Sequence, residues 1–152
     1  MLMKEIALTR TREDRRRYAL EGVGTMRVGG IVARTATASD AAGHTWHFRR
    51  RGRAAQATDE LGSLVGEYRP NRLGRGGRLR WGEREIALQA AGNLWQERYR
   101  LVDAHRGLGT CRGRSWGRHP VRFELADDAE LEAGLFLFAA FVVRGLAEYA
   151  AQ

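Results

Sequence analysis

The sequence is poor in cysteine and lysine, and it lacks the short motifs that mark common enzyme classes. Its single cysteine, Cys111, cannot pair within the chain, which excludes a disulfide scaffold and fits a reducing cytosol. It contains no P-loop, dinucleotide-binding fingerprint or nucleophile elbow. Residues 1–14 contain no apolar stretch of signal-peptide length. We therefore expect a cytoplasmic protein that is not an enzyme.

The 4 histidines and the cysteine do not form a metal-binding pattern. His44 and His47 are three positions apart in an expected strand, so their side chains would point to opposite faces. Cys111, His105 and His119 could meet across a hairpin, but no paired spacing supports a shared metal. A strand cysteine is also more often buried and inert than nucleophilic. We expect no metal site, no catalytic residue and no cofactor.

The chain is strongly basic, and almost all of its positive charge comes from arginine. It contains 26 basic and 18 acidic residues, for a formal net charge of +8, and Lys4 is its only lysine. An arginine-rich surface favours phosphate-bearing partners, because the guanidinium fork binds phosphate oxygens in pairs. A GC-rich genome and ordinary solubility would give the same composition. Both interpretations stay open on charge alone.

Two arginine-rich segments form the candidate binding surface. The first is residues 49–53, RRRGR, and the second is residues 69–80. If neighbouring strands bring the two segments together, they form one basic face that can hold phosphates by charge-assisted hydrogen bonds. Otherwise they are separate solvated turns. The candidate anion-binding residues are Arg49, Arg50, Arg51, Arg53, Arg72, Arg75, Arg78 and Arg80, with Arg69 in the second segment.

The tryptophans favour a protein core over a nucleic-acid surface. Trp46, Trp81 and Trp95 lie in segments where apolar and polar residues alternate, so we expect them in the core rather than on stacking platforms. Trp116 is the tryptophan that we expect to be exposed.

Short alternating segments run through most of the chain. The clearest is Val121, Phe123 and Leu125, separated by Arg122 and Glu124, and this period of two is typical of a half-buried strand. About ten such segments follow one another at spacings near ten residues, which indicates a barrel or a sandwich. Residues 94–102 are expected to form a longer strand, and residues 103–109 the turn after it.

The last part of the chain has a different pattern. Residues 133–143 read AGLFLFAAFVV, and a helix that is apolar on every face must be buried on every face. The run rises only about 16 Å, roughly half of a bilayer core, so we expect no transmembrane segment. We predict a helix over about residues 127–151. Asp127 is its expected cap, and the carboxylates after it fit a helix start better than a calcium loop.

Arg144 follows the apolar run but still lies inside the predicted helix. Its aliphatic stem is expected to lie along the surrounding strands while its guanidinium reaches the rim. A carboxylate partner is compatible with this position, and we expect a structural role.

Strands around one apolar helix favour a barrel over a sandwich. A sandwich core has no room for a helix about 10 Å wide, whereas a barrel of about ten or more strands does. We predict a mainly-β fold, a closed barrel of about ten to twelve strands around a buried hydrophobic C-terminal helix. The strands cover about residues 3–126, and a single domain covers residues 1–152.

Three segments resemble proteins of the tubby C-terminal-like superfamily. They are GSLVGEYRPNRLGRGGRLRWGEREIAL (residues 62–88), NLWQERYRLVDAHRGLG (residues 93–109) and GLFLFAAFVVRGLAEY (residues 134–149). This superfamily includes tubby domains, phospholipid scramblases and plant LURP-one-related proteins. The resemblance implies a bacterial scramblase-like member, a twelve-stranded barrel around a C-terminal helix, and affinity for anionic lipid. The cysteine-rich and acidic calcium-binding segments of scramblases are missing, and the basic residues of tubby domains cannot be matched one by one.

These observations predict a non-catalytic binding module. Its basic rim would bind anionic lipid headgroups, at the membrane periphery, or another acidic partner such as a protein. The alternative is a nucleic-acid-associated basic protein. A second alternative is a small-ligand-binding barrel, which the helix disfavours because it fills the lumen. The ligand and the oligomeric state do not follow from the sequence.

Overall fold

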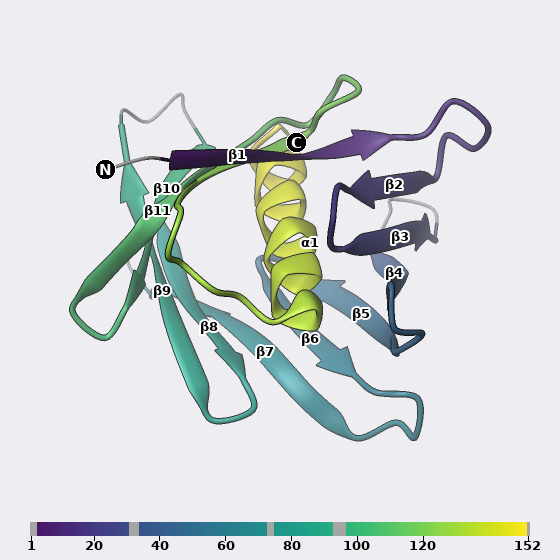
Figure 1. The fold of residues 1–152 in the computed structure, drawn as a ribbon, viewed down its shortest axis with the longest axis horizontal. Coiled ribbons are helices and arrows are strands. Elements are labelled where there is room, and N and C mark those ends of the chain that lie inside the picture. Colours follow the sequence, from purple (N-terminus) through teal and green to yellow (C-terminus); the bar gives the residue numbers. More distant parts are fainter. Residues whose placement is uncertain (1–2, 31–33, 73–74, 93–96, 152) are drawn as a thin grey trace.

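The computed structural model describes residues 3–30, 34–72, 75–92 and 97–151. Over these ranges the chain forms twelve strands followed by one helix, α1 (Ala133–Ala150) (Figure 1). The strands are β1 (Met3–Arg10), β2 (Arg17–Leu20), β3 (Gly24–Gly29), β4 (Thr35–Asp40), β5 (Thr45–Arg51), β6 (Ala54–Thr58), β7 (Leu64–Pro70), β8 (Gly76–Trp81), β9 (Arg84–Ala91), β10 (Glu97–Asp103), β11 (Arg106–Gly113) and β12 (Val121–Ala126).

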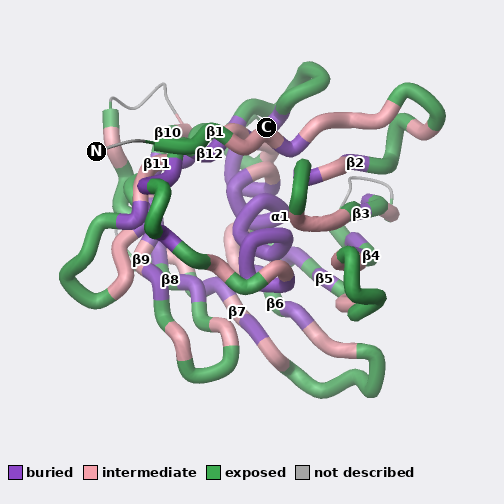
Figure 2. Tube along the Cα trace, in the orientation of Figure 1, coloured by how far each residue is buried: buried purple, intermediate pink, exposed green. Residues whose placement is uncertain are grey.

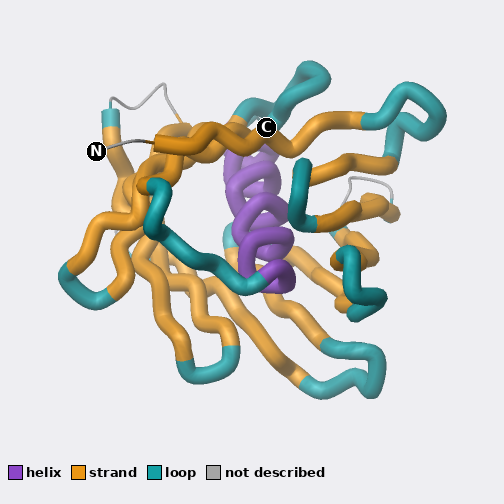
Figure 3. The backbone as a smooth tube through the Cα atoms, viewed as in Figure 1, coloured by secondary structure: helices purple, strands orange, loops and turns teal. Residues whose placement is uncertain are grey.

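The strands form a closed antiparallel barrel in which each strand pairs with its neighbours in sequence. The strands surround the central helix (Figure 3). β1 closes the barrel against β12, with Ile6 opposite Phe123 and Leu8 opposite Val121. Closure leaves no strand edge free to pair with another chain. Because consecutive strands are antiparallel neighbours, successive connections alternate between the two ends of the barrel. The fold prediction is thus confirmed.

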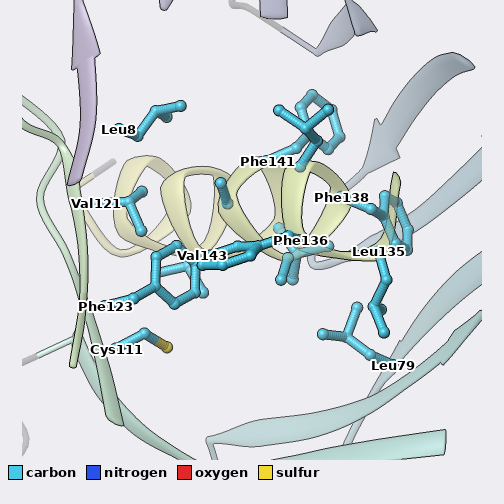
Figure 4. Close-up of a cluster of buried hydrophobic side chains, with 14 of the residues drawn as sticks. Leu8, Leu79, Cys111, Val121, Phe123, Leu135, Phe136, Phe138, Phe141 and Val143 are labelled. Atoms are coloured by element: carbon cyan, nitrogen blue, oxygen red, sulfur yellow. The ribbon is translucent and has the colours of Figure 1, made fainter. Parts of the chain in front are cut away.

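Helix α1 fills the barrel lumen (Figures 2 and 4). Phe138 is fully buried, and its ring centroid lies 5.2 Å from that of Phe48 on β5. Phe136 meets Phe123 on β12 edge-on at 4.8 Å. By length and composition alone α1 is long and apolar enough to cross a membrane, but 72% of it is buried inside the protein. The helix is therefore a core helix.

The strands alternate between the helix and solvent as their sequences predict. On β12, Val121, Phe123 and Leu125 are buried against the core, whereas Glu124 is exposed and Arg122 half-buried. This alternation places apolar side chains in the lumen and most charged side chains on the outer wall.

Two helix glycines allow the barrel wall to approach α1 closely. A Cβ atom on Gly134 would lie 2.3 Å from Cζ2 of Trp81 and 2.8 Å from Cζ2 of Trp46. A Cβ atom on Gly145 would lie 2.5 Å from Cδ of Arg50. Trp46 and Trp81 are partly buried and pack against the core, as predicted. Trp95 lies outside the described residues.

The predicted start of the helix is wrong. Helix α1 begins at Ala133 rather than Asp127, and its N-cap residue, Glu132, makes no side-chain capping hydrogen bond. The preceding carboxylates bind the barrel wall instead: Asp128 pairs with Arg106, and Glu132 with Arg84. Those ion pairs hold residues 127–132 as a connection across the end of the barrel.

Two details of the strand prediction also differ from the structure. β6 was not expected, because its alanines carry little strand signal; they are small residues that face the helix. The turn after β10 comprises residues 104–105 rather than 103–109. A register shift beside Leu101 and a positive φ of 55° at Ala104 let the chain reverse within this short turn. Residues 94–96 of the predicted strand lie outside the described residues.

Candidate binding surface at the basic end of the barrel

The alternation of connections gives the barrel two chemically different ends. One end surrounds the C-terminus of α1, where Gly113 at the end of β11 approaches Val143 and Ala147. The other surrounds its N-terminus, where Trp46 and Trp81 pack against Gly134. Strand ends on the C-terminal side are joined by residues 11–16, 30–34, 52–53, 71–75, 92–96 and 114–120. Residues 21–23, 41–44, 59–63, 82–83, 104–105 and 127–132 make the connections on the N-terminal side.

Charge is divided sharply between these ends. We call the C-terminal side the basic end: its connections contain nine arginines but only two carboxylates, Glu13 and Asp14. We call the other side the acidic end: its connections, all within the described residues, contain eight carboxylates and no lysine or arginine. The nine arginines are Arg12, Arg15, Arg16, Arg34, Arg53, Arg72, Arg75, Arg114 and Arg118. The eight carboxylates are Glu21, Asp59, Glu60, Glu83, Asp127, Asp128, Glu130 and Glu132.

This division also matches the dipole of the central helix. The helix N-terminus carries partial positive charge and lies at the acidic end, while the C-terminus carries partial negative charge and lies at the basic end. The charged connections therefore oppose the helix dipole at both ends. As a result, the surface is negative where the helix N-terminus lies and positive where its C-terminus lies. An approaching anion is attracted to the basic end and repelled from the acidic end.

The structure brings only some of the arginines predicted from the sequence together: Arg69, Arg72, Arg78 and Arg80 line one pocket on the wall of β7–β9, together with Glu67 and Glu85. Arg51, Arg53, Arg72 and Arg75 lie at or beside the basic end. The others occupy two different environments: Arg49, Arg78 and Arg80 lie on the outer wall, and Arg50 lies inside the barrel.

Arg50 is a structural residue that holds β5 against the helix. It is 6% exposed, and its guanidinium lies 3.3 Å from the Glu148 carboxylate. It also donates hydrogen bonds to the carbonyl oxygens of Gly145 and Gly52, at 3.4 Å and 3.3 Å. Burial lowers the pKa of Arg50, and the Glu148 carboxylate opposes that shift. The side chain of Arg50 therefore has a structural role and is not exposed to a ligand.

Arg144 shares the same carboxylate. Its guanidinium lies 2.9 Å from Glu148 and donates a hydrogen bond of 3.1 Å to the hydroxyl of Tyr18. It also lies 4.9 Å from the centroid of the Tyr18 ring, a cation–π contact. Glu148 is therefore the carboxylate partner of Arg144, and both arginines connect the last turns of α1 to the wall.

The arginines on β7 and β8 have carboxylates beside them. Arg69 and Arg80 lie 2.9 Å and 3.3 Å from the same carboxylate oxygen of Glu67, and Arg78 lies 2.9 Å from Glu85 on β9. Arg80 is directly opposite Glu67 across the strands, Arg78 reaches Glu85 diagonally from β8 to β9, and Arg69 lies two residues after Glu67 on the same strand. This part of the wall is a mixed-charge surface.

Fewer arginines at the basic end form ion pairs with carboxylates than on the wall of β7–β9. Arg12, Arg15, Arg16, Arg34, Arg72 and Arg118 are exposed and form no ion pair with any described residue. Arg75 differs, because it lies 3.8 Å from Glu97 and is largely covered. The exposed guanidinium groups remain available to a ligand.

A row of three arginines, missed in the sequence, lies on the wall below this end. Arg98 on β10 is directly opposite Arg112 on β11, which is directly opposite Arg122 on β12. Only Arg122 has a carboxylate partner among the described residues, Glu5 at 2.9 Å. Like charges in such cross-strand pairs are destabilising, so an anion bound here would relieve repulsion. Alternation in the sequence could have shown that each of these arginines faces outward. It could not have shown the strand register that places the three side by side.

The outer wall of β3–β6 contains a cleft of about 490 Å³ with a mixed polar and apolar lining. Arg27, Thr35, His47, Arg49 and Gln56 contribute side chains to it. Arg27 pairs with Asp14 at 3.1 Å, whereas Arg49 forms no ion pair with any described residue. The cleft can therefore offer a guanidinium and several hydrogen-bonding groups to a small anion.

Other chemistry-bearing side chains do not converge in the described part of the chain. No three His, Cys, Asp or Glu side chains there are close enough to hold a metal ion. Cys111 is buried, and burial raises the pKa of its thiol to about 12. The thiol is therefore protonated at neutral pH and is a poor nucleophile.

The fold and this surface define a closed antiparallel barrel with a central helix and two ends of opposite charge. No protein-family model, curated protein or solved structure matches the chain.

Proposed function

We propose that this protein is a non-catalytic binding module that binds anionic lipid surfaces through the basic end of its barrel. The observation that carries the proposal is the contrast between nine arginines and two carboxylates in the connections of that end. Each arginine near an anionic membrane contributes about 1 kcal/mol of attraction, so several acting together give useful affinity. The protein would be cytoplasmic and peripheral at the membrane.

The spread of the arginines favours a broad partner over a compact one. They belong to five separate connections around the barrel rim rather than to one pocket. A bilayer surface can contact several connections at once, and it exposes many phosphate groups in one plane. Arginine binds such groups through paired hydrogen bonds.

We also propose that the chain is a member of the tubby C-terminal-like superfamily. Twelve strands around a hydrophobic C-terminal helix are the arrangement that the sequence resemblance implies, and this supports the proposal. Proteins of that superfamily include binders of anionic lipid headgroups, which is consistent with the proposed function.

Vesicle co-sedimentation tests the proposed function. The protein should bind vesicles that contain phosphatidylserine but not vesicles of neutral phosphatidylcholine, and binding should weaken as salt screens the charges. A triple variant at the basic end, Arg15→Gln, Arg72→Gln and Arg118→Gln, should lose most of the binding. A matched variant on the wall away from this end, Arg80→Gln, Arg100→Gln and Arg106→Gln, removes the same charge and should bind like wild type.

Two results would contradict this proposal. One is equal binding of wild type to anionic and neutral vesicles at low salt. The other is equal loss in both triple variants, which would mean that net charge alone drives the interaction. Tight binding to DNA or RNA with a steep salt dependence, and none to vesicles, would favour a nucleic-acid partner instead.

A second candidate function is binding of a small phosphate-bearing ligand in the outer cleft. Its support is the 490 Å³ cleft beside Arg49, a guanidinium with no carboxylate partner among the described residues. Titration with inorganic phosphate or an inositol phosphate, followed by NMR, should shift resonances of Thr35, His47 and Gln56. The Arg49→Gln variant should lose those shifts, and shifts confined to the basic end would contradict this site.

A further inference from the structure

Large exposed apolar side chains are distributed unequally between the two ends. Among the described residues, the two exposed aromatic ones lie at the basic end: Trp116 is 71% exposed and Tyr149 is 45% exposed. Met3, Leu61 and Leu64, the exposed aliphatic ones, lie at or beside the acidic end. The basic end thus combines positive charge with the two side chains that are enriched where a membrane meets water.

Trp116 lies on the connection between β11 and β12, residues 114–120. The base of this connection is fixed by a backbone hydrogen bond of 2.7 Å from Arg114 to Pro120. A second bond, 2.8 Å long, joins the backbone nitrogen of Arg10 on β1 to the Arg118 carbonyl. Trp116 therefore projects from an anchored connection.

One cation of this connection lies over the exposed ring, and a second follows it in sequence. The guanidinium of Arg114 lies 5.6 Å from the centroid of Trp116, within the range of a cation–π contact. Arg118 is two positions further on and is exposed. An aromatic ring beside a guanidinium group, on a connection with a second exposed arginine, can enter the headgroup layer while the cations bind lipid phosphates.

We propose that Trp116 and Tyr149 insert into the headgroup layer of an anionic membrane, with Arg114 and Arg118 on the lipid phosphates. This inference rests on the proposed function and specifies the part of the basic end that contacts lipid. Apolar burial by the two rings adds to the electrostatic attraction, so binding would not depend on charge alone.

The arginine row extends this contact onto the wall. Arg112 precedes Arg114 by two residues, and Arg122 follows Pro120 by two, so the row leads directly into the connection. Repulsion between Arg98, Arg112 and Arg122 would be relieved by phosphates of the same bilayer. The row supplies a second layer of cations behind the inserted ring.

This geometry also fixes how the barrel would stand on the membrane. Trp116 and Tyr149 lie on the side where α1 ends, so the C-terminus of the helix faces the bilayer. The acidic end then points away from the anionic surface, which avoids repulsion from its eight carboxylates.

A nucleic-acid partner fits this surface less well. Proteins that bind single strands stack successive bases on aromatic rings along a basic groove. Here one ring lies on a projecting connection and the other on the last turn of the helix. Exposed rings on projecting segments suit a planar partner better.

Lipid-borne quenchers combined with co-sedimentation test the inference. Vesicles of phosphatidylserine and phosphatidylcholine that carry brominated acyl chains should quench part of the tryptophan fluorescence of wild type. In the Trp116→Ala variant that quenchable part should fall, and binding should weaken roughly tenfold. The matched control is Leu61→Ala, which removes an exposed side chain at the acidic end and should bind like wild type. Circular dichroism melts should confirm that both variants are folded.

The result that overturns the inference is distinct from failure of the proposed function. If wild type does not bind anionic vesicles at all, both fall. If wild type binds them but Trp116→Ala binds equally well and shows unchanged quenching, only the insertion of Trp116 is wrong. Loss of binding in Leu61→Ala alone would also overturn it, because the opposite end would then contact the lipid.

Discussion

The two ends of the barrel carry opposite charge although the same twelve strands build both. At the basic end, exposed arginines such as Arg15, Arg72 and Arg118 form no ion pair with a described residue. At the acidic end, carboxylates such as Asp128 and Glu132 pair with arginines of the neighbouring wall. Arginines of the wall therefore neutralise part of the negative charge at the acidic end. The exposed arginines at the basic end lack such carboxylate partners among the described residues, so they can bind an anionic partner.

A second contrast separates the basic end from the wall of β7–β9. Both are rich in arginine, but Glu67 and Glu85 compensate the wall, and no such carboxylates face most of the rim. The number of arginines in a segment therefore does not define a binding surface. What defines it is whether the fold supplies partners for them.

The largest expected effect comes from breaking the helix that holds both ends in one barrel. Phe138→Asp would place an unpaired carboxylate at a position that is 0% exposed, at a cost of more than about 4 kcal/mol. We expect this variant to be unfolded in circular dichroism melts at room temperature. Melting behaviour equal to wild type would mean that the helix is not the centre of the fold.

The next effect separates structural arginines from those available to a ligand. Glu148→Ala removes the shared carboxylate of Arg50 and Arg144, and breaking such a buried pair costs about 3 kcal/mol. The control is Glu85→Ala on the exposed wall, where the change should stay within about 1 kcal/mol. Urea unfolding measures both. Equal losses would show that Arg50 is not held by this pair.

Close packing at the acidic end should also be sensitive to one methyl group. Gly134→Ala places its Cβ against Trp46 and Trp81 and should destabilise the protein by about 2 kcal/mol. Gly107→Ala is the matched control, because nothing lies within 4 Å of that Cβ position. A Gly134→Ala variant as stable as the control would mean that the tryptophans are free to move away.

The smallest effect on stability is expected at the basic end itself. Arg72→Gln and Arg118→Gln remove exposed cations without ion-pair partners among the described residues, so stability should change by less than about 0.5 kcal/mol. A marked destabilisation in urea unfolding would indicate a structural role for these arginines, and the contrast with Arg50 would fail.

Periodicity in the sequence was enough to predict the architecture. The apolar run at residues 133–143 requires burial on every side, and alternation such as Val121, Phe123 and Leu125 supplies the strands around it. Boundaries were less predictable where tertiary contacts compete with local signals. Asp127 has a good capping side chain, but the helix starts at Ala133, and Asp128 and Glu132 before it pair with arginines of the wall.

The sequence was enough to predict that the candidate surface is rich in arginine, but not which arginines form it. Arginine-rich segments were visible in the sequence, yet Arg50 turns inward, and Arg78 and Arg80 have carboxylate partners that follow from strand register. Register joins residues far apart in sequence, and short alternating segments do not specify it. The division of charge between the ends could have been found, because in an antiparallel meander every second connection lies at the same end.

Amide hydrogen exchange with and without phosphatidylserine vesicles would show which end of the barrel binds the membrane, because it reports on both ends in one experiment. We expect vesicles to slow exchange in residues 114–120, 71–72 and 75 at the basic end. Exchange should stay unchanged in residues 59–63 and 82–83 at the acidic end. Protection of the acidic connections, or of the outer wall alone, would contradict the claim that the basic end is the surface that binds the membrane.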